Sequence, residues 1–176
     1  MMQYLTDVVR QFRQIKDLAE KALAQISDEE LFLALDEEAN SIAMLMKHMA
    51  GSLQTRWRDF PSAADDETGR DRDSEFAADE GDLKGVLIEQ WQAGWQYLFE
   101  AFESLTPEDM LKPVVIRGNT LSAIEAIDRQ LTHHAYHVGQ IVFLAKHFRS
   151  SAWQSLSIPR GKSAEFSTAV RRGREV

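Results

Sequence analysis

The stretch from Ser122 to Phe148, SAIEAIDRQLTHHAYHVGQIVFLAKHF, constrains the fold more than any other part of the chain. Its apolar residues recur at intervals of three and four, which predicts one long amphipathic helix with a buried face. The same stretch contains four of the five histidines. His133 and His137 are four residues apart, so both side chains rise from one helical face and can hold a single ion. His134 and His137, three apart, could do the same, and the spacing leaves this choice open.

The fifth histidine, His48, lies on a separate predicted helix that begins near residues 40–41. It falls on the flank of the apolar stripe, where a side chain can face a cleft between helices. Three histidines from two helices, with a fourth position left to water, are typical of a catalytic metal site. The alternative is that the histidines are hydrogen-bonded core or surface residues. That interpretation is strongest for His134, which lies within the apolar stripe of its helix, whereas His133 and His137 lie to one side of it.

Three further stretches show helical spacing of apolar residues, at about 4–26, 40–57 and 83–105. Together with 122–148 they predict four long helices around a shared apolar interior, an all-α fold of the four-helix bundle type. The connection at 59–82 is acidic and contains Pro and Gly. It is far longer than the ~4–6 residues usual between elements. We expect a long crossover loop that crosses the bundle, covers a site or is partly disordered.

The segment PVVIRGNTLS at 113–122 differs from the rest, because β-branched residues precede a Gly118-Asn119 turn signal. This pattern predicts a small two-stranded hairpin or an extended elbow before the last helix. At 176 residues the chain fits one domain of ordinary size. We expect a single helical bundle domain at 1–166, followed by a flexible basic tail at 167–176.

Charge and composition exclude several classes of function. The net charge is −8 and the sequence pI is about 5.1, and a surface of that sign repels phosphate, so nucleic acid is not expected as a partner. The chain has no cysteine, which excludes disulfides, thiolate metal sites and a nucleophilic thiol. It begins without the apolar run of a signal peptide, and no stretch approaches the ~20 apolar residues of a membrane span. We therefore expect a cytoplasmic protein that is not bound to a membrane.

Three segments together resemble the DinB-like superfamily: NSIAMLMKHMAGSLQTRWRDF at 40–60, RDRDSEF at 70–76 and IDRQLTHHAYHVGQIVFLAKH at 127–147. The closing W-x-x-LSIPRGKS at 153–163 resembles one branch of it whose function is unassigned. The resemblance covers nearly the whole chain. It implies a four-helix bundle in the DinB arrangement and a homodimer.

The resemblance also implies a divalent metal, nickel or zinc, held by three histidines. Carried over to this sequence, the ligands are His48, His133 and His137, which selects His133 over His134. The far ring nitrogen of each ligand is expected to meet a carboxylate or carbonyl oxygen. By residue type the candidates are Glu125, Asp128, Gln130 and Asn40, and the sequence does not place them relative to the histidines.

Characterised relatives in the superfamily include metal-dependent transferases and isomerases that use a low-molecular-weight thiol such as bacillithiol, mycothiol or glutathione. The resemblance therefore implies a transferase in which the metal holds the thiol as thiolate, the attacking species. Arg117, Arg160 and Lys162 are candidates to bind the carboxylates of such a small-molecule ligand, although simple pairing of Arg160 and Lys162 with the acidic surface is the favoured interpretation. The alternatives are a non-catalytic, metal-stabilised dimer acting in partner binding or stress response, and a metal-dependent hydrolase.

Overall fold

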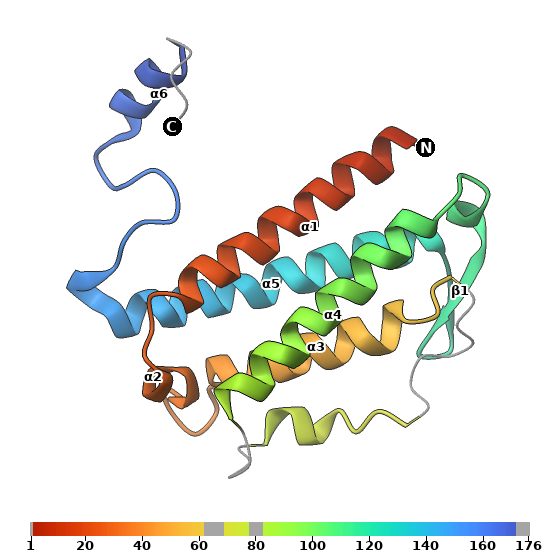
Figure 1. Ribbon diagram of the computed structural model, residues 1–176, viewed down its shortest axis with the longest axis horizontal. Coiled ribbons are helices and arrows are strands. Elements are labelled where there is room, and N and C mark those ends of the chain that lie inside the picture. The colour runs from red at the N-terminus through yellow and green to blue at the C-terminus, as the bar shows by residue number, and fades with distance from the viewer. Residues whose placement is uncertain (1, 62–68, 78–82, 172–176) are drawn as a thin grey trace.

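The computed structural model describes residues 2–61, 69–77 and 83–171 (Figure 1). The described chain is mainly helical, which confirms the predicted all-α class. Its α-helices are α1 (Met2–Leu23), α2 (Asp28–Phe32), α3 (Ile42–Trp57), α4 (Lys84–Ser104), α5 (Ala123–Arg149) and α6 (Ser163–Arg171). The remaining elements are three short 3-10 helices and two strands: η1 (Asp73–Phe76), η2 (Asp109–Leu111), η3 (Ser150–Ala152), β1 (Pro113–Ile116) and β2 (Asn119–Ser122).

Four long helices, α1, α3, α4 and α5, form the body of the molecule (Figure 1). The most extensive packing is between α3 and α4 and between α1 and α5. Large side chains fill the interior, since Phe12, Trp91 and Trp95 are almost completely buried. Contacts between α3 and α5 join the two helix pairs. The amphipathic stretches thus bury their apolar faces against one another, as the sequence predicts.

A capping box fixes the start of α5, the helix that carries four histidines. The hydroxyl of Ser122 accepts from the backbone N–H of Glu125, and the Glu125 carboxylate accepts from the backbone N–H of Ser122 at 2.7 Å. Such reciprocal bonds satisfy N–H groups that have no partner within the helix. The N-terminus of α5, and with it the direction in which each histidine points, is therefore set by local sequence.

The predicted hairpin is present immediately before α5. β1 pairs antiparallel with β2, with Pro113 opposite Ser122 and Ile116 opposite Asn119. The two turn residues both adopt positive φ, 50° for Arg117 and 71° for Gly118, as a tight two-residue hairpin turn requires. Because β2 ends at the residue that caps α5, the hairpin anchors the beginning of that helix.

The described part of the predicted crossover loop is not a free surface loop. Residues 69–77 contain η1, which packs against α3 (Figure 1). The rest of the 59–82 prediction falls partly on 62–68 and 78–82, outside the described residues.

The C-terminal segment leaves the four long helices after η3 and ends in α6 (Figure 1). The predicted boundary at residue 166 falls inside α6 and stays a prediction, and residues 172–176 of the predicted tail lie outside the described chain. In the described ranges, no helix combines the length and the apolar character needed to cross a membrane.

Candidate metal centre

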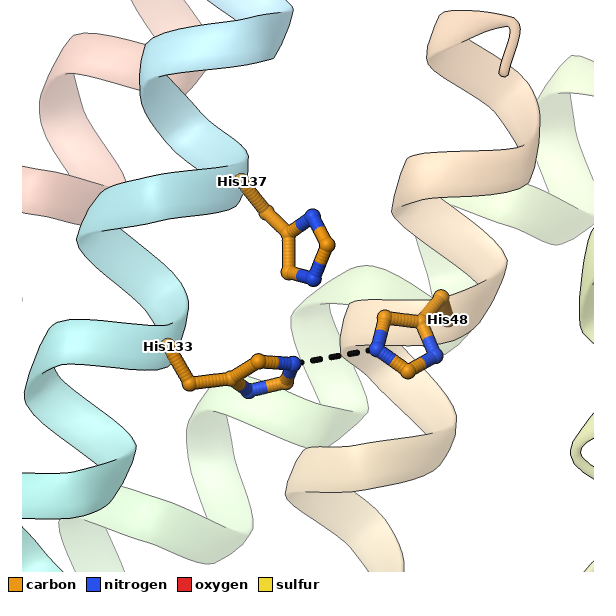
Figure 2. A group of neighbouring side chains, drawn as sticks. All are labelled: His48, His133 and His137. Carbon is orange, nitrogen blue, oxygen red and sulfur yellow. Dashed lines mark hydrogen bonds between the residues drawn. The ribbon is translucent and has the colours of Figure 1, made fainter. Parts of the chain in front are cut away.

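Three histidines converge between α3 and α5 (Figure 2). His48 comes from the middle of α3, and His133 and His137 come from successive turns of α5. One nitrogen from each ring lies within 4.8 Å of the other two, and the Nε2 atoms of His48 and His133 are 3.0 Å apart. The structure thus brings together the three residues that the sequence singled out, from positions 85 residues apart in the chain.

The spacing of the His48 and His133 nitrogens suits a metal ion. Zinc binds histidine nitrogen at about 2.0–2.1 Å, so two ligands of a tetrahedral site lie roughly 3.3 Å apart. The 3.0 Å separation of the His48 and His133 Nε2 atoms is close to that value. Two ring nitrogens at this distance require a proton or a cation between them, because their lone pairs would otherwise repel. The cluster could therefore hold a divalent metal ion.

Hydrogen bonds at the outer nitrogens decide which ring atoms face the cluster. Nδ1 of His48 lies 3.0 Å from a carboxylate oxygen of Glu75, and Nδ1 of His137 lies 2.8 Å from the side-chain oxygen of Gln140. Both oxygens accept hydrogen bonds, so each Nδ1 carries the ring proton and donates it. In a neutral imidazole this leaves the Nε2 lone pair free. His48 and His137 accordingly present ligand atoms to the centre.

The surroundings keep two of the rings neutral. Burial, reinforced by the neighbouring histidines His134, His137 and His48 and then by Arg70, lowers the pKa of His133 to about 2. Burial is also the main reason why the pKa of His137 is lowered. Metal ligation requires the unprotonated ring. At neutral pH both side chains are therefore in the form that can bind an ion.

His134 does not belong to the cluster, although it neighbours His133 in sequence. Its side chain is completely buried and packs edge-on against Phe12 and Trp95. Nδ1 donates a hydrogen bond of 2.7 Å to the backbone carbonyl of Gln130, and burial lowers the pKa of the ring to about 4. The prediction of a buried, hydrogen-bonded core histidine at this position is confirmed.

The oxygen acceptors predicted by residue type are wrong. Glu125 caps α5, Asp128 accepts from the Tyr4 hydroxyl at 2.7 Å, and Gln130 uses its backbone carbonyl for His134. Glu75 and Gln140 take the role for His48 and His137. For His133 the expectation fails, because its buried Nδ1 has no hydrogen-bond partner among the described residues. Gln140 could have been found, because a residue three positions after His137 lies on the same helical face. Asn40, the fourth candidate, lies before α3.

Glu75 belongs to η1, in the predicted crossover loop, where no periodic pattern points to a contact with α3. Its carboxylate accepts two hydrogen bonds of 2.7 Å from Arg70 in addition to the one from His48. Burial alone would raise the pKa of the Glu75 carboxyl, but the hydrogen bonds from His48 and Arg70 hold it below its ordinary value. Glu75 is therefore an anion at neutral pH and favours the Nδ1–H form of His48.

The cations nearest the cluster are also different from the predicted ones. Arg117 sits in the hairpin turn, and the segment with Arg160 and Lys162 leads away from the long helices toward α6 (Figure 1). Lys162 pairs with the exposed Glu165 at 2.8 Å, as its surface interpretation predicts. The described structure instead places two guanidinium groups from 69–77 close by. Arg70 donates to the backbone carbonyl of His48 at 3.2 Å.

The second of these groups is Arg72. It lies 4.9 Å above the ring of Phe76, and that ring in turn packs against His48 with centroids 4.7 Å apart. The three side chains form a stack that ends at the cluster. The RDRDSEF segment therefore contributes a carboxylate, an aromatic ring and two positive charges to the surroundings of the histidines.

Comparison with known proteins gives a family but no function. Residues 1–162 match the family model described as "Protein of unknown function (DUF1572)". That family is DinB-like in general terms, in agreement with the resemblance at this coarse level. No curated protein and no solved structure matches the chain. Since the matched region covers most of the sequence, the chain belongs to the DUF1572 family.

Proposed function

We propose that this protein is a metalloprotein with the DinB-type four-helix arrangement, which binds one divalent ion, nickel or zinc, through His48, His133 and His137. The observation that carries the proposal is the convergence of three ring nitrogens from two helices. The hydrogen bonds of His48 and His137 support it, because they leave both Nε2 lone pairs facing inward. Imidazole is a good ligand for nickel and zinc alike.

The proposed activity is a transferase reaction that uses a low-molecular-weight thiol. In the described residues the group of metal-ligating side chains has three members and no fourth Cys, Asp, Glu or His, which favours an open coordination position. A divalent ion held by neutral ligands supplies Lewis acidity and lowers the pKa of a thiol bound to it. The histidines would hold the ion. Arg72, over the Phe76 ring that packs on His48, supplies a positive charge near the cluster for an anionic ligand, whereas the charge of Arg70 is paired with Glu75.

A second candidate is a structural role for the metal, in a dimer that binds a partner. The histidines join α3 to α5, two helices that are distant in sequence. An ion at this place would therefore cross-link the two helix pairs and stabilise the folded state whether or not a reaction follows. We propose a homodimer on the resemblance alone, and sedimentation equilibrium of the purified chain would decide the oligomeric state.

Elemental analysis of the purified protein tests the metal site. We expect about one metal ion per chain in the wild type and its loss in His133→Ala. His147→Ala is the matched control, because this exposed histidine of α5 lies outside the cluster. A wild-type protein that takes up neither nickel nor zinc would contradict the proposal.

If metal is bound, activity toward electrophilic acceptors in the presence of glutathione, bacillithiol or mycothiol separates the two roles. Metal-dependent turnover supports the transferase. A stabilising metal without turnover favours the structural candidate.

A further inference from the structure

Glu75 occupies an unusual place for an acidic side chain of a surface connection. Only 8% of the residue is exposed, and both carboxylate oxygens are used. Oε1 accepts from Nε of Arg70 at 2.7 Å, and Oε2 accepts from Nη2 of Arg70 at 2.7 Å and from Nδ1 of His48 at 3.0 Å. A buried charge is costly unless it is paired and hydrogen-bonded. The hydrogen bonds from Arg70 and His48 therefore compensate the burial of the Glu75 charge and fix the carboxylate against His48.

Gly51 supplies the room for this contact. It lies three residues after His48, on the same face of α3. A Cβ atom at this position would come within 2.2 Å of the Oε1 atom of Glu75 and 3.4 Å of Nε of Arg70, closer to the carboxylate than any real side chain allows. Glycine inside a helix is less favourable than alanine. Its presence here is explained by the carboxylate that passes over it.

We infer that Glu75 is a positioning residue for the candidate metal centre, with Arg70 holding its carboxylate and Gly51 leaving the space that it needs. The carboxylate keeps the proton of His48 on Nδ1 and so directs Nε2 toward His133 and His137. Because its carboxylate oxygens are used by His48 and Arg70, Glu75 acts through His48 and is not a catalytic residue. The expected consequence, tighter metal binding, rests on the proposed function. The positioning of His48 does not, because it concerns the tautomer of this ring in the metal-free protein.

This role makes η1 a part of the site. Removing a carboxylate that orients a metal-binding histidine typically weakens metal affinity 10–100-fold. Two independent changes should therefore have the same effect. Glu75→Gln removes the negative charge, while Gly51→Ala pushes the carboxylate aside and improves the helical propensity of α3.

The matched control is Gly139→Ala. Gly139 lies in α5 two residues after His137, and a Cβ there meets no atom within 4 Å. The change has the same chemistry as Gly51→Ala and lies two residues from a cluster histidine instead of three, but it does not touch Glu75. Circular dichroism and thermal unfolding of the metal-free proteins verify that all variants are folded.

Two measurements test the inference. Competition with a chromophoric chelator should give a zinc affinity 10–100-fold weaker for Gly51→Ala and Glu75→Gln than for wild type and Gly139→Ala. The ¹⁵N chemical shifts of the His48 ring in metal-free protein should show the Nδ1–H tautomer in wild type and Gly139→Ala, and a mixture in Gly51→Ala. The second measurement needs no metal, so it decides the positioning role even if the wild type fails to bind zinc.

An unchanged His48 tautomer in Gly51→Ala would overturn the inference. So would a wild-type ring that is already a mixture of tautomers. Equal zinc affinity of Gly51→Ala and Gly139→Ala in folded protein would also overturn it, because displacement of the carboxylate would then have no consequence for the centre.

Discussion

Two neighbouring residues of α5, His133 and His134, lie in two different regions of the molecule. His133 is half-buried and faces the ring nitrogens of His48. His134 is completely buried and faces aromatic rings of the core. The pKa is strongly lowered in both, to about 2 and about 4, and burial is the largest cause in each case. A depressed pKa therefore does not separate a candidate ligand from a core residue.

What separates them is the partner of each ring nitrogen. Nδ1 of His134 is bound to a carbonyl of its own helix, and its Nε2 is buried in the core without a hydrogen-bond partner among the described residues. His133 instead directs Nε2 at another ring nitrogen at a distance suited to a shared ion. One residue step along a helix turns the side chain by about 100°. That turn moves the imidazole from the core to the candidate metal centre.

Alanine substitution should show the largest difference between the two histidines, in stability and in metal uptake. His134→Ala empties a completely buried position, so we expect the free energy of unfolding to fall by roughly 2–4 kcal/mol, as for large-to-small core changes. His133→Ala should cost less, on the order of 1 kcal/mol, but should abolish metal uptake. Urea unfolding of both metal-free variants measures the difference. Equal losses of stability in the two variants would contradict the distinction between a core histidine and a histidine of the candidate metal centre.

Metal removal should affect the centre and leave the core intact. A ligand that binds only the folded state at a free concentration of 100 Kd stabilises it by about 2.7 kcal/mol. We expect zinc or nickel to raise the Tm of wild type and of His147→Ala, and a chelator to reverse the effect. His133→Ala should show no such shift. A metal-induced rise in Tm that survives His133→Ala would place the binding site elsewhere.

The low pKa of His134 predicts a pH dependence of stability. The pKa of the unfolded residue is about 6.5, and the folded value is about 4. Between these values the unfolded state binds more protons, so stability is complete above pH 6.5 and is lost as the pH falls toward 4, by roughly 1.4 kcal/mol per pH unit. Metal-free wild type should therefore lose stability more steeply in this range than His134→Leu, which cannot be protonated. If the free energy of unfolding of wild type and of His134→Leu changed with pH in the same way, His134 would not be buried as a neutral ring.

The smallest effect is expected far from both regions. The pair between Lys162 and Glu165 is exposed, and such pairs contribute little. Lys162→Ala should change the free energy of unfolding by less than ~0.5 kcal/mol and should leave metal affinity unchanged. Loss of metal or thiol binding in this variant would restore Lys162 as a ligand-binding residue.

Helical periodicity places His133 and His137 on one face of α5 and His48 on the flank of a second apolar stripe, but it was the resemblance that selected His133 over His134 as the ligand. The same periodicity identifies His134 as a core residue. Helical periodicity could not identify Glu75, because this residue lies in a 3-10 helix, 27 residues after its partner His48. Contacts of this kind depend on where an irregular segment packs. The sequence left open whether the crossover crosses the bundle, covers a site or is partly disordered.

In the fold, too, local features were predictable from the sequence, whereas the packing of an irregular segment was not. The long helices, the capping box at Ser122 and the hairpin before α5 are local features, and all of them were predictable. Where η1 docks onto α3, the Glu75 carboxylate lies in the space that a side chain at Gly51 would fill, and the sequence does not show that the two residues face each other. A helical glycine without an evident reason is the one signal in the sequence that could have pointed to a close approach.

X-ray absorption spectroscopy of the zinc-loaded protein tests the central claim most directly. We predict three imidazole nitrogens at about 2.0–2.1 Å and one further light atom from solvent in the wild type, and no protein-bound zinc in His133→Ala. The wild-type spectrum is expected for His134→Ala, because that ring belongs to the core. A wild-type spectrum with fewer than three imidazoles, or one that is unchanged by His133→Ala, would contradict a three-histidine centre between α3 and α5.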